Sequence, residues 1–137
     1  NCDSRPRHKH QRLGFELAVG KQPTTSPVAA RLRRPFLPIR KAGKLPCAVI
    51  GVDYELEYGL DRLEMDPLAV AEDQKVAIVD DLLATGGTAL AATELLRKAG
   101  ARGEDAAFVI DLPDLGGSGK LARQEVAVHT LMGFEGD

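Results

Sequence analysis

The stretch from Lys75 to Leu90 constrains the fold more than any other part of the chain. It begins with Val76-Ala-Ile-Val79, an apolar run rich in β-branched residues. Such a run is short enough to be a strand buried on both faces. Two adjacent carboxylates, Asp80 and Asp81, stand where we expect that strand to end. The sequence therefore predicts a buried strand with an acidic pair at its carboxyl end.

A loop of small residues, Ala84-Thr-Gly-Gly-Thr88, follows the acidic pair and is called the glycine loop below. After it, apolar residues recur at the i, i+3, i+4, i+7 spacing of a helix, at Ala92, Leu95, Leu96 and Ala99. Gly100 is a typical helix stop. The order is therefore strand, acidic pair, glycine loop and helix.

This order of elements is typical of an anion site at a helix N-terminus. Gly86 and Gly87 allow backbone N–H groups to approach a phosphate without a Cβ in the way. Thr85 and Thr88 add hydroxyl donors, and the positive end of the helix faces the anion. Nearby acids suit sugar hydroxyls or a hydrated metal ion. The plainer alternative is an ordinary strand–turn–helix unit with solvated acids.

The rest of the chain alternates strand-like and helix-like segments, which predicts an α/β fold. We expect strands at 36–39, 48–50, 54–58, 62–65, 76–79, 106–111 and 126–132, and short helices at 28–32, 67–71 and 120–123. The predicted architecture is a mainly parallel twisted sheet flanked by helices, with residues 48–58 as a protruding β-ribbon. In such sheets ligands bind beyond the carboxyl ends of the strands, where Asp80 and Asp81 fall.

Length and charge indicate one domain with an unusual start. The chain has 137 residues. Residues 1–25 form a basic segment without periodicity, and residues 26–137 are the predicted core. Up to Lys44 there are eleven Lys and Arg residues against two acids, and beyond it seven against eighteen. A basic start suits a solubilising or nucleic-acid-binding tail, or a surface for a polyanionic ligand. With 4% aromatic residues and no tryptophan, nucleic acid is not an expected partner.

The sequence favours a cytoplasmic protein. No run of about 18 apolar residues is present to span a membrane, and the polar N-terminus does not resemble a signal peptide. Cys2 and Cys47 have neither metal-ligand nor redox-motif spacing, which suggests a reducing compartment.

The string from Val79 to Thr88 resembles the phosphoribosyl-pyrophosphate (PRPP) binding loop of the type I phosphoribosyltransferases. Two further segments, Arg40-Lys-Ala-Gly-Lys-Leu-Pro46 and Tyr54-Glu-Leu-Glu-Tyr-Gly59, resemble the adenine-specific members in order and spacing. Ile110-Asp-Leu-Pro-Asp-Leu-Gly-Gly117 is similar to the bacterial ones. The similarity runs from about Ser26 to Asp137.

The resemblance implies a role for each matching residue. Asp80 and Asp81 would bind the ribose hydroxyls. The 5′-phosphate would be bound by Ala84, Thr85, Gly86, Gly87 and Thr88, and the pyrophosphate by Arg40, Lys41, Lys44 and Arg5.

On the predicted ribbon, Glu57 would exchange a proton with the purine at N7, and Tyr58 would help close the ribbon over the site. Without the resemblance, the simplest interpretation of Glu57 is a solvated charge and that of Tyr58 is a packing residue. Arg40 and Lys41 would then belong to a solvated turn.

The implied reaction converts adenine and PRPP to AMP and pyrophosphate with Mg²⁺, in a homodimer. The start of the chain departs from the family pattern, because Pro6 follows Asp3-Ser-Arg5 and residues 6–25 match nothing in it. The family's N-terminal hood is also missing, so the chain looks truncated. Two alternatives remain: a PRPP- or nucleotide-binding domain without catalysis, and a phosphoribosyltransferase for another base.

Overall fold

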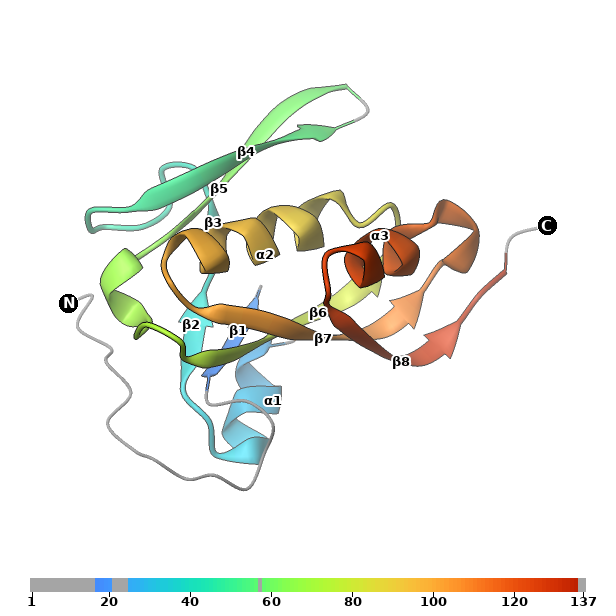
Figure 1. Cartoon of the computed structure of the whole chain (residues 1–137), viewed down its shortest axis with the longest axis horizontal. Helices are drawn as coiled ribbons and strands as arrows, with labels where there is room; N and C mark the ends of the chain where they lie inside the picture. Colours follow the sequence, from blue (N-terminus) through green and yellow to red (C-terminus); the bar gives the residue numbers. More distant parts are fainter. Residues whose placement is uncertain (1–16, 21–24, 57, 136–137) are drawn as a thin grey trace.

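A five-stranded parallel sheet forms the centre of the molecule (Figure 1). The computed structural model describes residues 17–20, 25–56 and 58–135. Its elements are β1 (Leu17–Gly20), α1 (Thr25–Leu32), β2 (Phe36–Pro38), β3 (Arg40–Lys41), β4 (Ile50–Leu56), β5 (Gly59–Met65), β6 (Lys75–Leu83), α2 (Gly87–Lys98), β7 (Arg102–Asp111), α3 (Gly117–Arg123) and β8 (Ala127–Gly133). Two short 3-10 helices, Pro67–Ala69 and Pro113–Leu115, connect them.

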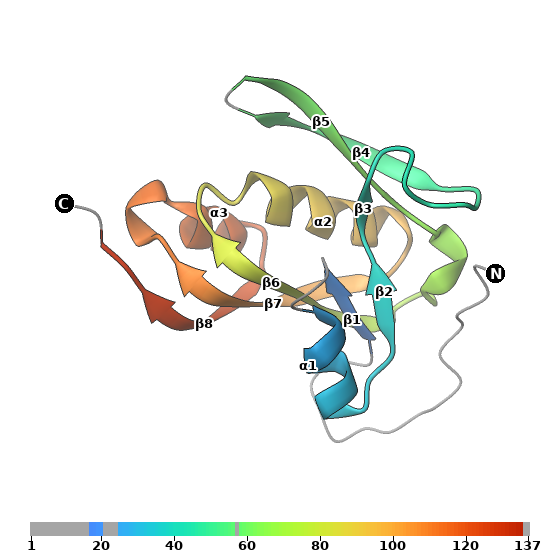
Figure 2. The same ribbon diagram turned by 180° about the vertical axis from the view of Figure 1, so that it is seen from behind.

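The strand order in the sheet is β2-β1-β6-β7-β8, and every neighbouring pair is parallel. Helices α2 and α3 cover one face and α1 the other (Figures 1 and 2). Strand β6 lies between β1 and β7, and its residues Val76–Val79 are buried. The predicted α/β fold with a parallel sheet flanked by helices is confirmed.

Strands β3, β5 and β4 form a separate antiparallel sheet, called the ribbon below, which contains the ribbon predicted at residues 48–58. Strand β3 was predicted only as a turn. It lies across the outer side of α2 (Figure 1). Its own side chains Val52, Leu63 and Met65 are buried in the hydrophobic core. Lys98 Nζ at the end of α2 donates a hydrogen bond to the Gly51 carbonyl over 3.2 Å. The ribbon is therefore packed on α2 along its base, while its tip extends beyond.

Several predicted boundaries are wrong. The two strands predicted at 48–50 and 54–58 are one strand, β4, because it pairs without a break with β5 from Ile50 to Leu56. Helices α1 and α3 also begin three residues earlier than predicted, at Thr25 and Gly117.

Strand β6 is longer than predicted and contains the acidic pair. It continues to Leu83, because its carboxyl end still pairs with β7 through Leu82 and Leu83. Asp80 and Asp81 therefore lie within the last residues of the strand rather than after it. They are held by the sheet, which fixes their place more firmly than a loop would.

Strand β1 lies inside the segment that the sequence analysis set apart from the core. Residues 17–20 pair with both β2 and β6, so they belong to the central sheet. The sequence predicted no strand here, because four residues without a flanking pattern give no periodicity.

Cys47, in the connection between β3 and β4, is disulfide-bonded. This differs from the reduced cysteines that the composition suggested. Among the described helices, none combines the length and the apolar character that crossing a bilayer requires.

Candidate functional site

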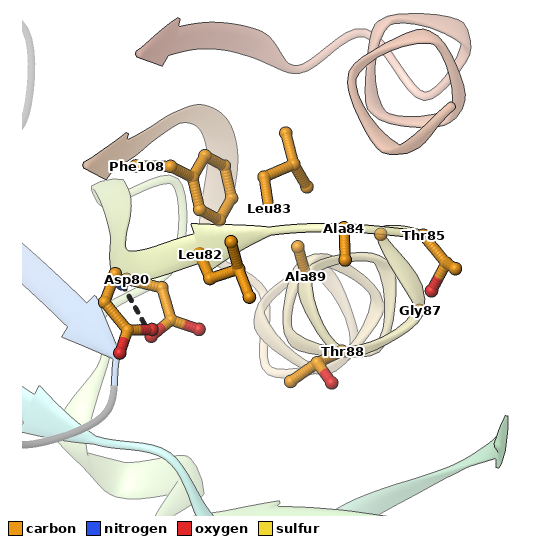
Figure 3. A pocket seen from close by; sticks show the side chains of 11 residues that line it. Asp80, Leu82, Leu83, Ala84, Thr85, Gly87, Thr88, Ala89 and Phe108 are labelled. Atoms are coloured by element: carbon orange, nitrogen blue, oxygen red, sulfur yellow. Dashed lines mark hydrogen bonds between the residues drawn. The ribbon is translucent and has the colours of Figure 1, made fainter. Parts of the chain in front are cut away.

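The acidic pair and the glycine loop line one cavity of about 250 Å³ at the carboxyl end of β6 (Figure 3). Leu82, Leu83, Ala89 and Phe108 complete its lining. In Figure 3, Asp80 and Thr88 lie on one side of β6, and Leu83 and Phe108 on the other. The structure therefore brings together seven of the predicted site residues: Asp80, Asp81, Ala84, Thr85, Gly86, Gly87 and Thr88.

The glycine loop makes a sharp turn from β6 into α2. Gly86 has a φ of +85°, in the left-handed region that favours glycine. No side chain caps the helix at this residue, and its carbonyl accepts the Leu90 N–H over 2.8 Å. Gly86 therefore allows α2 to begin at the carboxyl end of the sheet, facing the cavity.

The backbone amides of residues 84–88 are available to a ligand. Within the part of the chain that the structure describes, none of them donates a hydrogen bond. A helix leaves its first N–H groups without partners, and they carry a partial positive charge. These residues line the cavity beside the hydroxyls of Thr85 and Thr88, and amides without partners there suit an anion with several acceptor oxygens.

The two carboxylates differ in their surroundings. Asp80 is half-buried and Asp81 is exposed. Asp80 Oδ1 accepts a hydrogen bond from the Asp81 N–H over 2.9 Å (Figure 3). The Asp80 side chain is thereby held against its neighbour's backbone. The pair presents acceptor oxygens at the edge of the cavity, which suits sugar hydroxyls.

The buried hydroxyl of Thr25 supports the end of β6. Its Oγ1 donates a hydrogen bond to the Val79 carbonyl over 2.7 Å. Since Val79 directly precedes Asp80, this bond ties the start of α1 to the acidic pair. Sequence reasoning missed Thr25, because no local pattern reveals a contact across 54 residues of chain.

The basic residues Arg40 and Lys41 form β3, at the base of the ribbon. Ile39, just before them, lines a small crevice together with Asp80 and Thr88. The chain from β2 therefore reaches the acidic pair where β3 begins. Arg40 is exposed, and so is Lys44 on the following turn.

Lys41 is paired with an acid of the ribbon. Its Nζ lies 2.8 Å from Asp61 Oδ2, and the Tyr54 hydroxyl donates to the same oxygen over 3.3 Å. The hydrogen bond with Asp61 raises the pKa of Lys41. The same bond lowers the pKa of Asp61, helped by the backbone N–H of Arg62. Lys41 must exchange this partner to bind another anion.

The tip of the ribbon reaches the start of α2. A Cβ at Gly87 would lie 3.8 Å from the Glu55 carbonyl oxygen, so the end of β4 lies near the glycine loop. Tyr58, at the tip, is 93% exposed, so its ring is not packed on the part of the chain that the structure describes. This differs from the packing role that its apolar ring allowed. Glu57 and Arg5 lie outside the described residues.

No cluster of three or more His, Cys, Asp or Glu side chains that suits a metal ion occurs in residues 17–20, 25–56 and 58–135. The only acids at the cavity itself are Asp80 and Asp81, among the residues that the structure places. Two carboxylates fit an ion that keeps several waters and is held mainly by a substrate.

A family model described as "Phosphoribosyl transferase domain" matches residues 25–121. The chain is 63% identical over 109 residues to the adenine phosphoribosyltransferase of Erythrobacter litoralis, covering 80% of this chain and 61% of that protein. It is 51% identical over 139 residues to that of Novosphingobium aromaticivorans, covering 98% of this chain and 78% of that protein. The chain thus spans about three-fifths of the first of these relatives.

Solved structures show the same similarity. The adenine phosphoribosyltransferase of Thermoanaerobacter pseudethanolicus superposes with a TM-score of 0.82 at 39% identity, covering 90% of this chain and 73% of that one. The enzyme of Saccharomyces cerevisiae, complexed with an imino-altritol bisphosphate and adenine, gives 0.80 at 37% identity, covering 88% and 69%. The family match includes the acidic pair, the glycine loop and the basic residues of β3, whereas Arg5 lies outside it.

Proposed function

The chain belongs to the phosphoribosyltransferase family, and on that premise we propose that it transfers the 5-phosphoribosyl group from PRPP to adenine, giving AMP and pyrophosphate in purine salvage. The observation that carries this proposal is the cavity at the end of β6, which is lined by two carboxylates and by residues 84–88, whose amides donate no hydrogen bond within the described residues. The similarity to adenine phosphoribosyltransferases supports adenine as the base.

The sugar phosphate occupies this cavity in our proposal. The amides of residues 84–88 and the hydroxyls of Thr85 and Thr88 bind the 5′-phosphate. Asp80 and Asp81 accept hydrogen bonds from the ribose 2′- and 3′-hydroxyls. Hydrogen bonds to charged groups contribute about 1.5–3 kcal/mol each, so this set binds the ribose phosphate firmly and in one orientation.

The pyrophosphate group is bound by cations at the base of the ribbon. Arg40, Lys41 and Lys44 are the basic residues proposed for this role, with Arg5 from the segment outside the described residues. Charge on the departing pyrophosphate is offset there, while the acidic pair lies close to the sugar as it becomes oxocarbenium-like. Fixed charges of this kind lower the barrier without rearranging during the reaction.

The ribbon is the proposed lid. Glu57 holds or removes the proton at N7 of the purine, and Tyr58 comes down over the base. The exposure of Tyr58 supports this, because a ring that packs against nothing in the open state has a surface to bury on closing. Water is excluded when the tip closes over the start of α2.

Mg²⁺ is the proposed cofactor, bound through PRPP with Asp80 and Asp81 nearby, and it neutralises charge on the pyrophosphate. We further propose a cytoplasmic homodimer, in which residues 26–137 together with β1 form one catalytic domain. Neither nucleic acid nor a membrane is a proposed partner.

The test is AMP formation from adenine and PRPP with Mg²⁺, followed by a panel of guanine, xanthine and uracil. The double variant Asp80→Asn, Asp81→Asn loses about 1.5 kcal/mol or more for each carboxylate, which together lowers kcat/KM about a hundredfold or more. The matched control is Glu72→Gln with Glu94→Gln, because both acids are exposed and neither lines the cavity. Turnover by the Asp80/Asp81 variant equal to that of the control would refute the site.

Two other outcomes would select the alternatives. PRPP binding by calorimetry with no product from any base would indicate a binding domain without catalysis. Product from a base other than adenine would correct the specificity and leave the site intact.

A further inference from the structure

Two glycines from distant parts of the chain meet behind the cavity. Gly86 is in the glycine loop, and Gly117 is the first residue of α3. A Cβ at Gly86 would lie 3.0 Å from Gly117 Cα, and a Cβ at Gly117 would lie 3.0 Å from the Gly86 nitrogen. The backbones therefore touch directly, and neither position has room for a side chain.

A hydrogen bond joins the same two segments. The Gly117 N–H donates to the Ala84 carbonyl over 3.1 Å. A carbonyl oxygen that faced the cavity would repel an anion, because it carries partial negative charge. Bonded to Gly117, the Ala84 carbonyl is directed towards α3, and the amides that follow it donate no hydrogen bond within the described residues.

We propose that Gly117 is a positioning residue for the glycine loop, and that its lack of a side chain sets the affinity for the 5′-phosphate. This inference rests on the proposed function. Gly117 touches no substrate itself. It acts by holding the Ala84 carbonyl and by allowing α3 to approach the loop at backbone distance.

The space around Gly117 explains why alanine fails there. A Cβ would overlap the Ala84 carbonyl oxygen and lie 2.9 Å from Leu83 Cδ1. The carbonyl is backbone and cannot swing aside as the end of a flexible side chain can. We expect alanine at position 117 to push the glycine loop away from α3. The loop amides would then no longer point at the phosphate oxygens.

Gly119 provides a matched control in the same helix. A Cβ at Gly119 would meet no atom within 4 Å. Alanine there gains helix propensity and touches nothing. Any effect shared by Gly117→Ala and Gly119→Ala would therefore come from the helix itself rather than from the contact with the loop.

The experiment measures two ligands by calorimetry on the full chain and both variants. Ribose 5-phosphate probes the loop and the acidic pair, and pyrophosphate probes the basic residues of the ribbon base. We expect Gly117→Ala to bind ribose 5-phosphate at least tenfold more weakly and pyrophosphate as tightly as the unmodified chain does. Gly119→Ala should bind both ligands unchanged.

Equal binding of ribose 5-phosphate by Gly117→Ala and the unmodified chain would overturn the inference and leave the proposed function standing. A folded Gly117→Ala protein that binds ribose 5-phosphate and pyrophosphate equally more weakly would also overturn the inference. A local role of Gly117 predicts weaker binding of ribose 5-phosphate alone. Failure of the unmodified chain to bind ribose 5-phosphate would overturn the proposed function and the inference together.

If Gly117→Ala does not fold, NMR on the unmodified chain decides the question. Binding of ribose 5-phosphate should shift the amide resonance of Gly117 together with those of residues 85–88, while that of Gly119 stays in place. A Gly117 resonance that does not move while the loop resonances do would overturn the positioning role.

Discussion

Replacing Thr25 by valine removes a buried hydroxyl beside the acidic pair while keeping the β-branched shape. Thr25 is 0% exposed, and its Oγ1 donates to the Val79 carbonyl over 2.7 Å. A hydrogen bond of this kind contributes about 1 kcal/mol, and a buried acceptor that loses its donor costs about 1–3 kcal/mol. We therefore expect Thr25→Val to lower the free energy of unfolding by about 1–2 kcal/mol.

The same change should weaken ligand binding, because the bond ties the start of α1 to the residue before Asp80. Without it, the end of β6 can shift relative to α1. A displacement of about 1 Å at a site of this kind can cost as much as a hundredfold in rate. We expect the dissociation constant for ribose 5-phosphate to rise roughly tenfold, which corresponds to about 1.4 kcal/mol of binding free energy.

Urea unfolding and calorimetry measure the two effects separately. Thr93→Val is the control, because Thr93 is 2% exposed and its Oγ1 donates to the Ala89 carbonyl over 2.9 Å within α2. Thr93→Val should lose some stability but bind ribose 5-phosphate as tightly as the unmodified chain. Thr25→Ser retains a hydroxyl, so it should bind ribose 5-phosphate more tightly than Thr25→Val does. Were Thr25→Val to bind ribose 5-phosphate as tightly as Thr93→Val, the link between Thr25 and the acidic pair would be refuted.

Two further changes test the ribbon and the core. Asp61→Asn frees Lys41 from its ion pair, so pyrophosphate should bind severalfold more tightly by calorimetry. The pKa of Asp61 is lowered from its ordinary value of 3.8, so the ion pair with Lys41 is fully present above pH 3.8. The advantage of the variant should therefore disappear as the pH falls through the lowered pKa of Asp61. An unchanged pyrophosphate affinity at neutral pH would contradict the competition between Asp61 and pyrophosphate for Lys41. Leu95→Ala removes a side chain that is 0% exposed in α2, and urea unfolding should show a loss of about 2–5 kcal/mol; a loss below about 1 kcal/mol would contradict the packing of α2 between sheet and ribbon.

Local patterns were sufficient to predict the centre of the fold. The apolar run Val76–Val79 predicted the buried strand, and the helical spacing that ends at Gly100 predicted α2. The glycine loop lies between them as expected, because its glycines favour a turn and the flanking elements fix both of its ends. Patterns of this kind depend on near neighbours in the chain, which a sequence displays directly.

Contacts between distant segments were not predictable in the same way. Strand β1 exists because β2 and β6 flank it, and nothing within Leu17–Gly20 reveals those partners. The start of α3 at Gly117 was not predicted, since the expected helix began at residue 120 and the approach of Gly117 to Gly86 depends on the folded backbone. Strand β4 was predicted as two strands for a related reason, because its continuous pairing with β5 is a contact between segments that the sequence does not display.

The most direct test of the account is a crystal structure of the chain with ribose 5-phosphate bound. We expect the phosphate to lie within about 3 Å of the backbone nitrogens in the glycine loop. The Asp80 and Asp81 carboxylates should each accept a hydrogen bond from a ribose hydroxyl. A phosphate bound elsewhere, or a sugar that neither carboxylate touches, would contradict the account.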